Sequence, residues 1–185
     1  CVMIPDGERR TACISSQVGC PVGCYFCASG VGGLRRNLTT GEIVEQVLRV
    51  SAEVQASDPG VPSAGHRETT VRRAASGREP AEPSDRESPS AGTRLSNIVV
   101  MGLGEPLANY DAVVRAVRTI NAPWGPNIGA RKITISTVGL PKQIRRLADE
   151  GLQLNLALSL HAPTDGLRQE LIPWAERISL AELTG

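Results

Sequence analysis

The sequence predicts an α/β fold, a partial (β/α) barrel with four strand–helix units and a disordered insertion. Strand-like apolar runs and helix-like apolar stripes alternate four times along the chain, which favours a parallel sheet. Polar and glycine-rich motifs fall where the strands end, and a (β/α) barrel carries its chemistry there. We therefore expect residues 1–55 and 95–185 to form one incomplete core, interrupted by 56–94.

The first strand–helix unit surrounds a cluster of cysteines. Residues 10–16 alternate apolar and small polar side chains, which predicts a strand leading into the cysteine loop. Beyond the loop, Thr39 or Thr40 is the expected N-cap of a helix that has Glu42 in its first turn. An apolar stripe then continues to about Val54, where the helix should end.

Residues 56–94 differ in kind from the rest of the chain. Fifteen of these 39 residues are Gly, Pro or Ser, and none is aromatic, Leu or Ile. Such a segment cannot bury enough apolar area to offset the entropy lost on ordering. We predict a flexible, low-complexity surface insertion. The alternative is an arm whose Arg67, Arg72 and Arg73 contact RNA.

The other three units follow in order after the insertion. Pro141 suits the first turn of a helix, and Gly151 suits its end. The predicted strands are 97–101, 132–137 and 152–160, and the predicted helices are 111–120, the segment between Pro141 and Gly151, and a last helix from Thr164.

Three thiols lie together in the segment CPVGCYFC, at Cys20, Cys24 and Cys27. They are too close for all to satisfy disulfide geometry with one another, but Gly23 lets the loop curl around one metal centre. A structural zinc site needs a fourth ligand, and the sequence offers none near the three cysteines. A [4Fe–4S] cluster on three thiolates keeps one iron open for a small molecule such as S-adenosylmethionine. The alternative is three buried, small apolar side chains.

Further candidate residues stand at the other strand ends. Glu105 could accept hydrogen bonds from a bound ammonium group, with Gly104 allowing close approach, or it could be a plain loop carboxylate. The hydroxyls of Ser136 and Ser159 suit a ribose or a carboxylate, or they simply cap strand ends. His161 is either a pocket residue or a structural histidine.

The composition excludes some classes and favours others. Twenty basic and nineteen acidic residues give a net charge of +1, and aromatics make up 3%, so neither charge nor stacking indicates a nucleic-acid binder. No apolar run reaches the length of a membrane span, and no signal peptide is visible. Three clustered thiols among five Cys favour a reducing cytoplasm. The chain starts at Cys1 and stops within a new helical pattern, so we expect a fragment of a longer protein.

Four segments of the chain carry a family resemblance. CISSQVGCPVGCYFCASGVGGLRRNL, MGLGEPLANYDAV, RKITISTVG and LALSLHAP resemble the radical-SAM adenine methyltransferases of ribosomal RNA. The resemblance covers nearly the whole chain except 56–94. The GEP of the second segment is nearer to the housekeeping RlmN group than to the antibiotic-resistance Cfr group, with which GEA is associated.

The resemblance implies roles for individual residues. Cys13 matches a strand cysteine that resolves a covalent protein–RNA intermediate by forming a disulfide with a second, methyl-carrying cysteine. That second cysteine lies near the C-terminus of the family and is outside this chain. The resemblance implies that the cluster is held by Cys20, Cys24 and Cys27, and that S-adenosylmethionine is bound by Gly104, Glu105, Ser136, Ser159, Leu160 and His161.

The implied activity is methylation of carbon 2 of adenosine in 23S rRNA, and in tRNA. One S-adenosylmethionine methylates the carrier cysteine, and a second is cleaved to a radical that activates this methyl group. The implied setting is a cytoplasmic monomer served by an electron donor such as flavodoxin. The alternatives are another radical-SAM enzyme, acting on a small molecule or peptide, and an inactive fragment.

Overall fold

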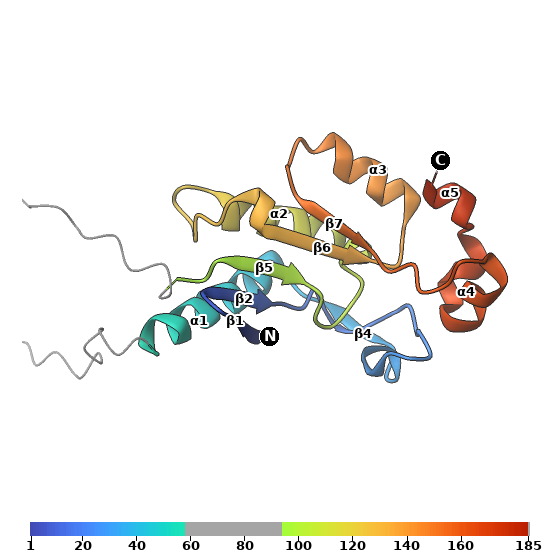
Figure 1. The fold of residues 1–185 in the computed structure, drawn as a ribbon, viewed down its shortest axis with the longest axis horizontal. Coiled ribbons are helices and arrows are strands. Elements are labelled where there is room, and N and C mark those ends of the chain that lie inside the picture. Colours follow the sequence, from blue (N-terminus) through green and yellow to red (C-terminus); the bar gives the residue numbers. More distant parts are fainter. Residues whose placement is uncertain (58–93, 185) are drawn as a thin grey trace, which may run out of the picture.

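A computed structural model describes residues 1–57 and 94–184 and has an α/β architecture (Figure 1). Most of the predicted insertion, 58–93, lies outside the described residues. Five strands form one sheet in the order β1-β2-β5-β6-β7, and two more form a separate ribbon, β3-β4. The strands are β1 (Val2–Asp6), β2 (Arg9–Cys13), β3 (Gln17–Gly19), β4 (Leu34–Asn37), β5 (Asn97–Val100), β6 (Ile133–Thr137) and β7 (Asn155–Leu158).

The four strands β2, β5, β6 and β7 run parallel to one another. Their register places Ala12 beside Ile98, and Ile98 beside Ile133. Each of these strands is followed along the chain by a helix, so the prediction of four strand–helix units is confirmed. Because the strands are parallel, their carboxyl ends meet at one edge of the sheet.

The helices begin where local sequence signals favour a start. Thr39 caps α1 in a capping box: its side chain accepts from the Glu42 amide, and Glu42 accepts from the Thr39 amide. Pro141 occupies the first turn of α3, and the Thr164 side chain caps α4. The helices are α1 (Thr40–Ala56), α2 (Tyr110–Asn121), α3 (Pro141–Asp149), α4 (Asp165–Leu171) and α5 (Leu180–Thr184).

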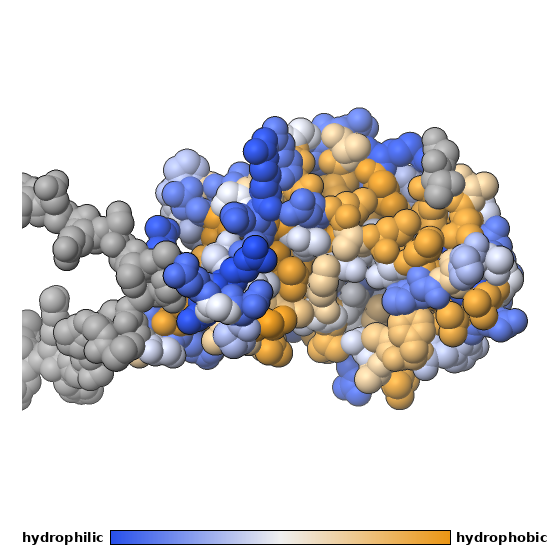
Figure 2. All heavy atoms as spheres, in the orientation of Figure 1, coloured by the Kyte–Doolittle hydropathy of each residue, from blue (hydrophilic) through white to orange (hydrophobic). Residues whose placement is uncertain are grey.

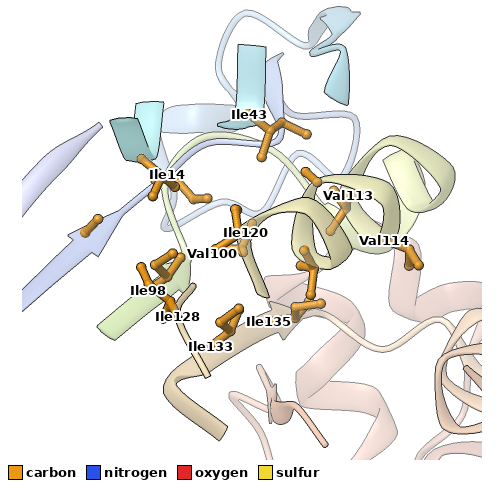
Figure 3. Close-up of a cluster of buried hydrophobic side chains, with 14 of the residues drawn as sticks. Ile14, Ile43, Ile98, Val100, Val113, Val114, Ile120, Ile128, Ile133 and Ile135 are labelled. Atoms are coloured by element: carbon orange, nitrogen blue, oxygen red, sulfur yellow. The ribbon is translucent and has the colours of Figure 1, made fainter. Parts of the chain in front are cut away.

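The main core lies between the sheet and the helices α1, α2 and α3. Figure 3 shows Ile98, Ile133 and Ile135 of the strands directed toward side chains of α2. Burial alternates along β5 and β6, because helices cover only one face of the sheet. Each fully buried Ile contributes about 1.5–3 kcal/mol to folding. Thr134 and Ser136 alternate with these buried residues, so they point to the opposite face and are half-buried.

The structure adds the strands β1, β3 and β4 to those predicted and shortens two others. β1 pairs with β2 as a hairpin around Gly7, and the Asp6-Gly7 dipeptide is a turn signal that could have revealed it. The predicted strand 10–16 ends at Cys13, and the predicted strand 152–160 is reduced to β7. The residues that flank β7 form loops, and the loop after β7 carries Ser159 and His161.

Hydrophobic side chains are also exposed on the face seen in Figure 2, over β7 and the segment from α4 to α5. Leu156, Leu158 and Leu160 are each exposed by roughly two fifths. In the ranges that the structure describes, no helix combines the length and apolarity needed to cross a bilayer.

Candidate functional site

One pocket of about 190 Å³ lies at the carboxyl edge of the parallel strands. It brings together the cysteine loop, the turn after β5, and the ends of β6 and β7. Eight of the residues predicted from the sequence line it: Cys20, Cys24, Cys27, Gly104, Glu105, Ser136, Ser159 and His161. Segments far apart in the sequence therefore meet at one place.

Close backbone packing shapes the cysteine loop. Gly23 has a φ of +70°, and a Cβ on Gly30 would come within 2.9 Å of the Gly23 Cα. The two glycines allow the loop to fold back on itself, as the sequence suggested for Gly23. A turn follows in which the Cys27 amide donates to the Cys24 carbonyl at 3.0 Å. The loop thus presents three thiols toward one pocket.

Two of the three thiols have pKa values above the ordinary range. Burial raises the pKa of Cys20, and it raises the pKa of Cys24 to about 11, with the charges of Cys20 and Cys27 adding to the effect. Burial therefore favours the protonated form of both thiols. A metal that binds them must therefore displace protons, which its positive charge makes favourable.

The spacing of the possible metal ligands distinguishes a single metal ion from a cluster. Within 1–57 and 94–184, no three His, Cys, Asp or Glu side chains lie close enough to hold one metal ion. A cluster makes a different demand from a single ion, because each thiolate binds its own iron atom. The chemistry of three thiols around one pocket fits such a cluster.

Glu105 is a buried carboxylate, 3% exposed, in the wall of the pocket. Its Oε1 accepts from the Leu107 amide at 3.0 Å, and its Oε2 accepts from the Val138 amide at 2.9 Å. Burial raises the pKa of Glu105, while these hydrogen bonds oppose the rise. The carboxylate thus joins the end of β6 to the turn after β5, a structural task that the sequence did not reveal.

Gly104 precedes Glu105 with a φ of +102°. A Cβ at this position would come within 2.6 Å of the Gln17 Cβ. The Gln17 Oε1 in turn accepts from the Glu105 amide at 2.8 Å. Gly104 thus permits a close approach to Gln17 and also lines the pocket, where its predicted approach to a ligand stays a prediction. A buried Gln17 holds the GLGEP turn in place.

The ends of β6 and β7 contribute polar groups to the lining of the pocket. The hydroxyls of Ser136 and Ser159 lie 3.2 Å apart. The ring of His161 contacts that of Phe26, with centroids 4.5 Å apart, and His161 adopts a φ of +60°. Such a backbone conformation is uncommon outside glycine and is concentrated at functional sites. Leu160 is more than a third exposed and is not part of the pocket lining.

Cys13 is the last residue of β2 and lies outside the pocket. Ala12 and Ile14 on either side of it are buried in the core, so the Cys13 side chain points to the opposite face of the sheet. Through the register of β2 with Val99 and of Val99 with Thr134, this is the face that carries Ser136. The thiol is partly buried and free.

Two residues near the site were not identified from the sequence. Val138 lines the pocket, and its amide is bound by Glu105. Arg168 of α4 is 1% exposed and donates to the Val138 carbonyl from the other side. A single Arg in a short polar helix resembles an ordinary surface residue, so only the tertiary structure reveals its burial.

Comparison with known proteins yields relatives for nearly the whole chain. A protein of Thermotoga neapolitana, named probable dual-specificity RNA methyltransferase RlmN, is 44% identical over 98% of this chain and 42% of its own length. Proteins of the same name from Mycobacterium sp. strain KMS and Rhodopirellula baltica are 48% and 44% identical and are covered over 42% and 39% of their lengths. No family model matches the chain.

The fold is similar to that of a solved structure. A radical SAM methyltransferase from Sphaerobacter thermophilus superposes with a TM-score of 0.77 and is 41% identical. The match covers 98% of this chain and 43% of that protein. The chain thus spans about two fifths of the length of the proteins that it matches.

Proposed function

Since the chain belongs, over the part of its relatives that it covers, to the RlmN group of radical SAM methyltransferases, we propose that the protein containing it methylates RNA. The proposed reaction is transfer of a methyl group to carbon 2 of adenosine in 23S rRNA, and in tRNA, with S-adenosylmethionine as the methyl source. The names of the relatives and of the solved structure support methylation of RNA, and the position on adenosine follows from the family resemblance.

One observation carries the proposal. The cysteine loop and three strand-end motifs, distant in sequence, line a single pocket at the edge of the sheet where this fold class places its chemistry. The convergence favours a site for a cofactor over a set of unrelated buried cysteines. It also accounts for the polar residues at the ends of both β6 and β7.

The residues of the pocket fit a [4Fe–4S] cluster and S-adenosylmethionine. Cys20, Cys24 and Cys27 would hold the cluster, which supplies the electron needed to cleave the cofactor when bound. Glu105 would accept the cofactor's ammonium group beside its two amide donors. The hydroxyls of Ser136 and Ser159 would bind its ribose or carboxylate, and Gly104 and the strand end at Leu160 and His161 would complete the site.

Cys13 would act on the substrate side of the site rather than as a ligand. It points to the open face of the sheet, the same face as Ser136, and lies apart from the other three thiols in the pocket lining. A thiol there could form a disulfide with the methyl-carrying cysteine of the complete protein and so release the product. The remaining parts of the proposal are a monomeric, cytoplasmic enzyme and an electron donor such as flavodoxin.

An assay on the full-length protein tests the function. Reconstituted with iron and sulfide without oxygen, and given reductant, S-adenosylmethionine and unmodified 23S rRNA, it should produce 2-methyladenosine detectable by nucleoside mass spectrometry.

Cys13→Ala should still cleave S-adenosylmethionine but stall as a covalent protein–RNA adduct, seen as a shifted band on a denaturing gel. Cofactor cleavage without methylation of rRNA or tRNA would favour a radical-SAM enzyme with another substrate. Methylation at carbon 8 would contradict the position.

We also infer that 1–55 and 95–185 form the incomplete core and that 56–94 is an insertion. Ala56 ends α1 and Ser57 caps it, so the segment to exchange is 58–93. Replacement by a short Gly/Ser linker should change the thermal midpoint by less than about 4 °C, which corresponds to roughly 1 kcal/mol in a chain of this size. A larger loss in a calorimetric scan would mean that the segment packs on the core.

A further inference from the structure

Arg168 is a buried cation without an ionic partner in the part of the chain that the structure describes. It is 1% exposed, and none of the four ion pairs there includes it. Its guanidinium donates to the Val138 carbonyl and, at 3.1 Å, to the Ile178 carbonyl. Its Nε is buried with no hydrogen-bond partner. Two carbonyls leave the charge without an ion-pair partner, and a buried charge is normally paired.

No carboxylate among the described residues forms an ion pair with Arg168. Asp165, on the same helix, interacts electrostatically with Arg168, but its Oδ1 accepts from the Leu180 amide at 2.7 Å. Burial lowers the pKa of Arg168, yet a guanidinium stays protonated in proteins. The positive charge therefore persists inside the molecule.

Arg168 lies behind the wall of the cysteine pocket. A small apolar cluster of Val22, Ile172 and Ala175 packs against Cys20 and Cys24. The Ile172 amide donates to the Arg168 carbonyl at 2.8 Å, and the Tyr25 amide donates to the Leu171 carbonyl at 3.1 Å. The bond from Tyr25 joins α4 to the cysteine loop, and Figure 1 shows the two segments on the same side of the molecule. Arg168 also interacts electrostatically with Cys24.

The pocket carries several negative charges when its thiols are ionised. Its lining holds the Glu105 carboxylate and three cysteines, and none of its described lining residues is Lys or Arg. Three thiolates on a [4Fe–4S] cluster outweigh the cluster's own positive charge, and reduction adds one more electron. A buried cation behind the wall favours that reduced state, since charges interact strongly where water is excluded.

We propose that Arg168 is the counter-ion of the metal centre held by the cysteine loop and that it raises the centre's reduction potential. The proposal rests on the proposed function only in requiring a cluster on Cys20, Cys24 and Cys27. A purely structural role, holding the Val138 and Ile178 carbonyls, is the competing explanation. Geometry and charge can be separated by substitution, because Lys keeps the charge but loses the forked donor geometry.

The test uses the full-length protein, reconstituted with iron and sulfide without oxygen, as wild type, Arg168→Met and Arg168→Lys. Arg49→Met, on an exposed ion pair of α1, is the matched control. Iron content is measured first, followed by a redox titration monitored by electron paramagnetic resonance. At a fixed applied potential, Arg168→Met should lower the ratio of reduced to oxidised cluster at least tenfold, which is 59 mV for a one-electron couple. Arg168→Lys and Arg49→Met should stay near wild type.

Each of the remaining outcomes either supports or overturns the counter-ion proposal. Normal iron with an unchanged potential in Arg168→Met overturns the proposal, and so do equal shifts in the Met and Lys variants. If Arg168→Met takes up no iron, wild-type iron uptake by Arg168→Lys supports a role for the positive charge. Loss of iron uptake in both variants overturns the proposal. A wild type that binds no iron refutes the metal centre and the counter-ion together. A wild type that binds iron but fails to methylate RNA refutes only the proposed function.

Discussion

Replacing Cys24 with alanine should abolish iron binding by the full-length protein. Anaerobic reconstitution of the wild type should yield about four irons per chain and a broad absorption in the blue, as a [4Fe–4S] cluster requires. Cys24→Ala removes one of the three thiolates that line the pocket, and two are insufficient to hold the cluster. Its iron content should fall below about one per chain in a colorimetric assay.

The matched control is Cys13→Ala. Cys13 is the same residue type and is also partly buried, but it lies on the open face of the sheet outside the pocket. It should retain full iron. One zinc per wild-type chain with no iron bound would refute the cluster, and loss of iron in both variants would show that iron content reports folding rather than ligation.

Glu105→Gln should weaken S-adenosylmethionine binding by roughly ten- to 150-fold, measured by calorimetric titration of the iron-loaded protein. This range corresponds to ~1.5–3 kcal/mol, the usual contribution of a hydrogen bond to a charged group. Iron content should remain normal, since Glu105 is no ligand. Glu45→Gln, on the exposed ion pair of α1, should change neither quantity.

The structure adds a second consequence for Glu105. Both of its oxygens accept backbone amides, so a Gln amide group must face one of these donors. The variant should lose about 1–3 kcal/mol of stability from that unpaired amide, offset in part by removal of a buried charge. Unchanged cofactor affinity in a variant of lower thermal midpoint would assign Glu105 a structural role alone.

The pH dependence of stability gives an independent measure of Glu105. Because burial raises its pKa above the ordinary 4.5, the folded protein holds this proton more tightly than the unfolded chain does. The contribution of Glu105 to the free energy of unfolding therefore falls as pH rises from 4.5 through the raised pKa. The wild-type thermal midpoint should decline relative to that of Glu105→Gln across this window, and parallel curves would contradict the raised pKa.

Much of the fold followed from local signals. Thr39 with Glu42, Pro141, and Thr164 are start signals that act within one turn of helix, and all three occur at helix starts in the structure. The hairpin of β1 and β2 was missed although Asp6-Gly7 signals it. The ends of the last strand were misjudged because apolar residues continue into loops on either side of β7.

The sequence by itself determined the alternation of the four parallel strands with helices, the three-thiol motif and the strand-end residues of the pocket. Those properties depend on residue type and spacing over a few positions. Only the tertiary structure decided that Glu105 carries two backbone amides, that Gly104 is pressed against Gln17, and that Arg168 is buried behind Cys24. Each of these depends on contacts between segments dozens of residues apart, and burial of a single polar side chain leaves no periodic pattern in the chain.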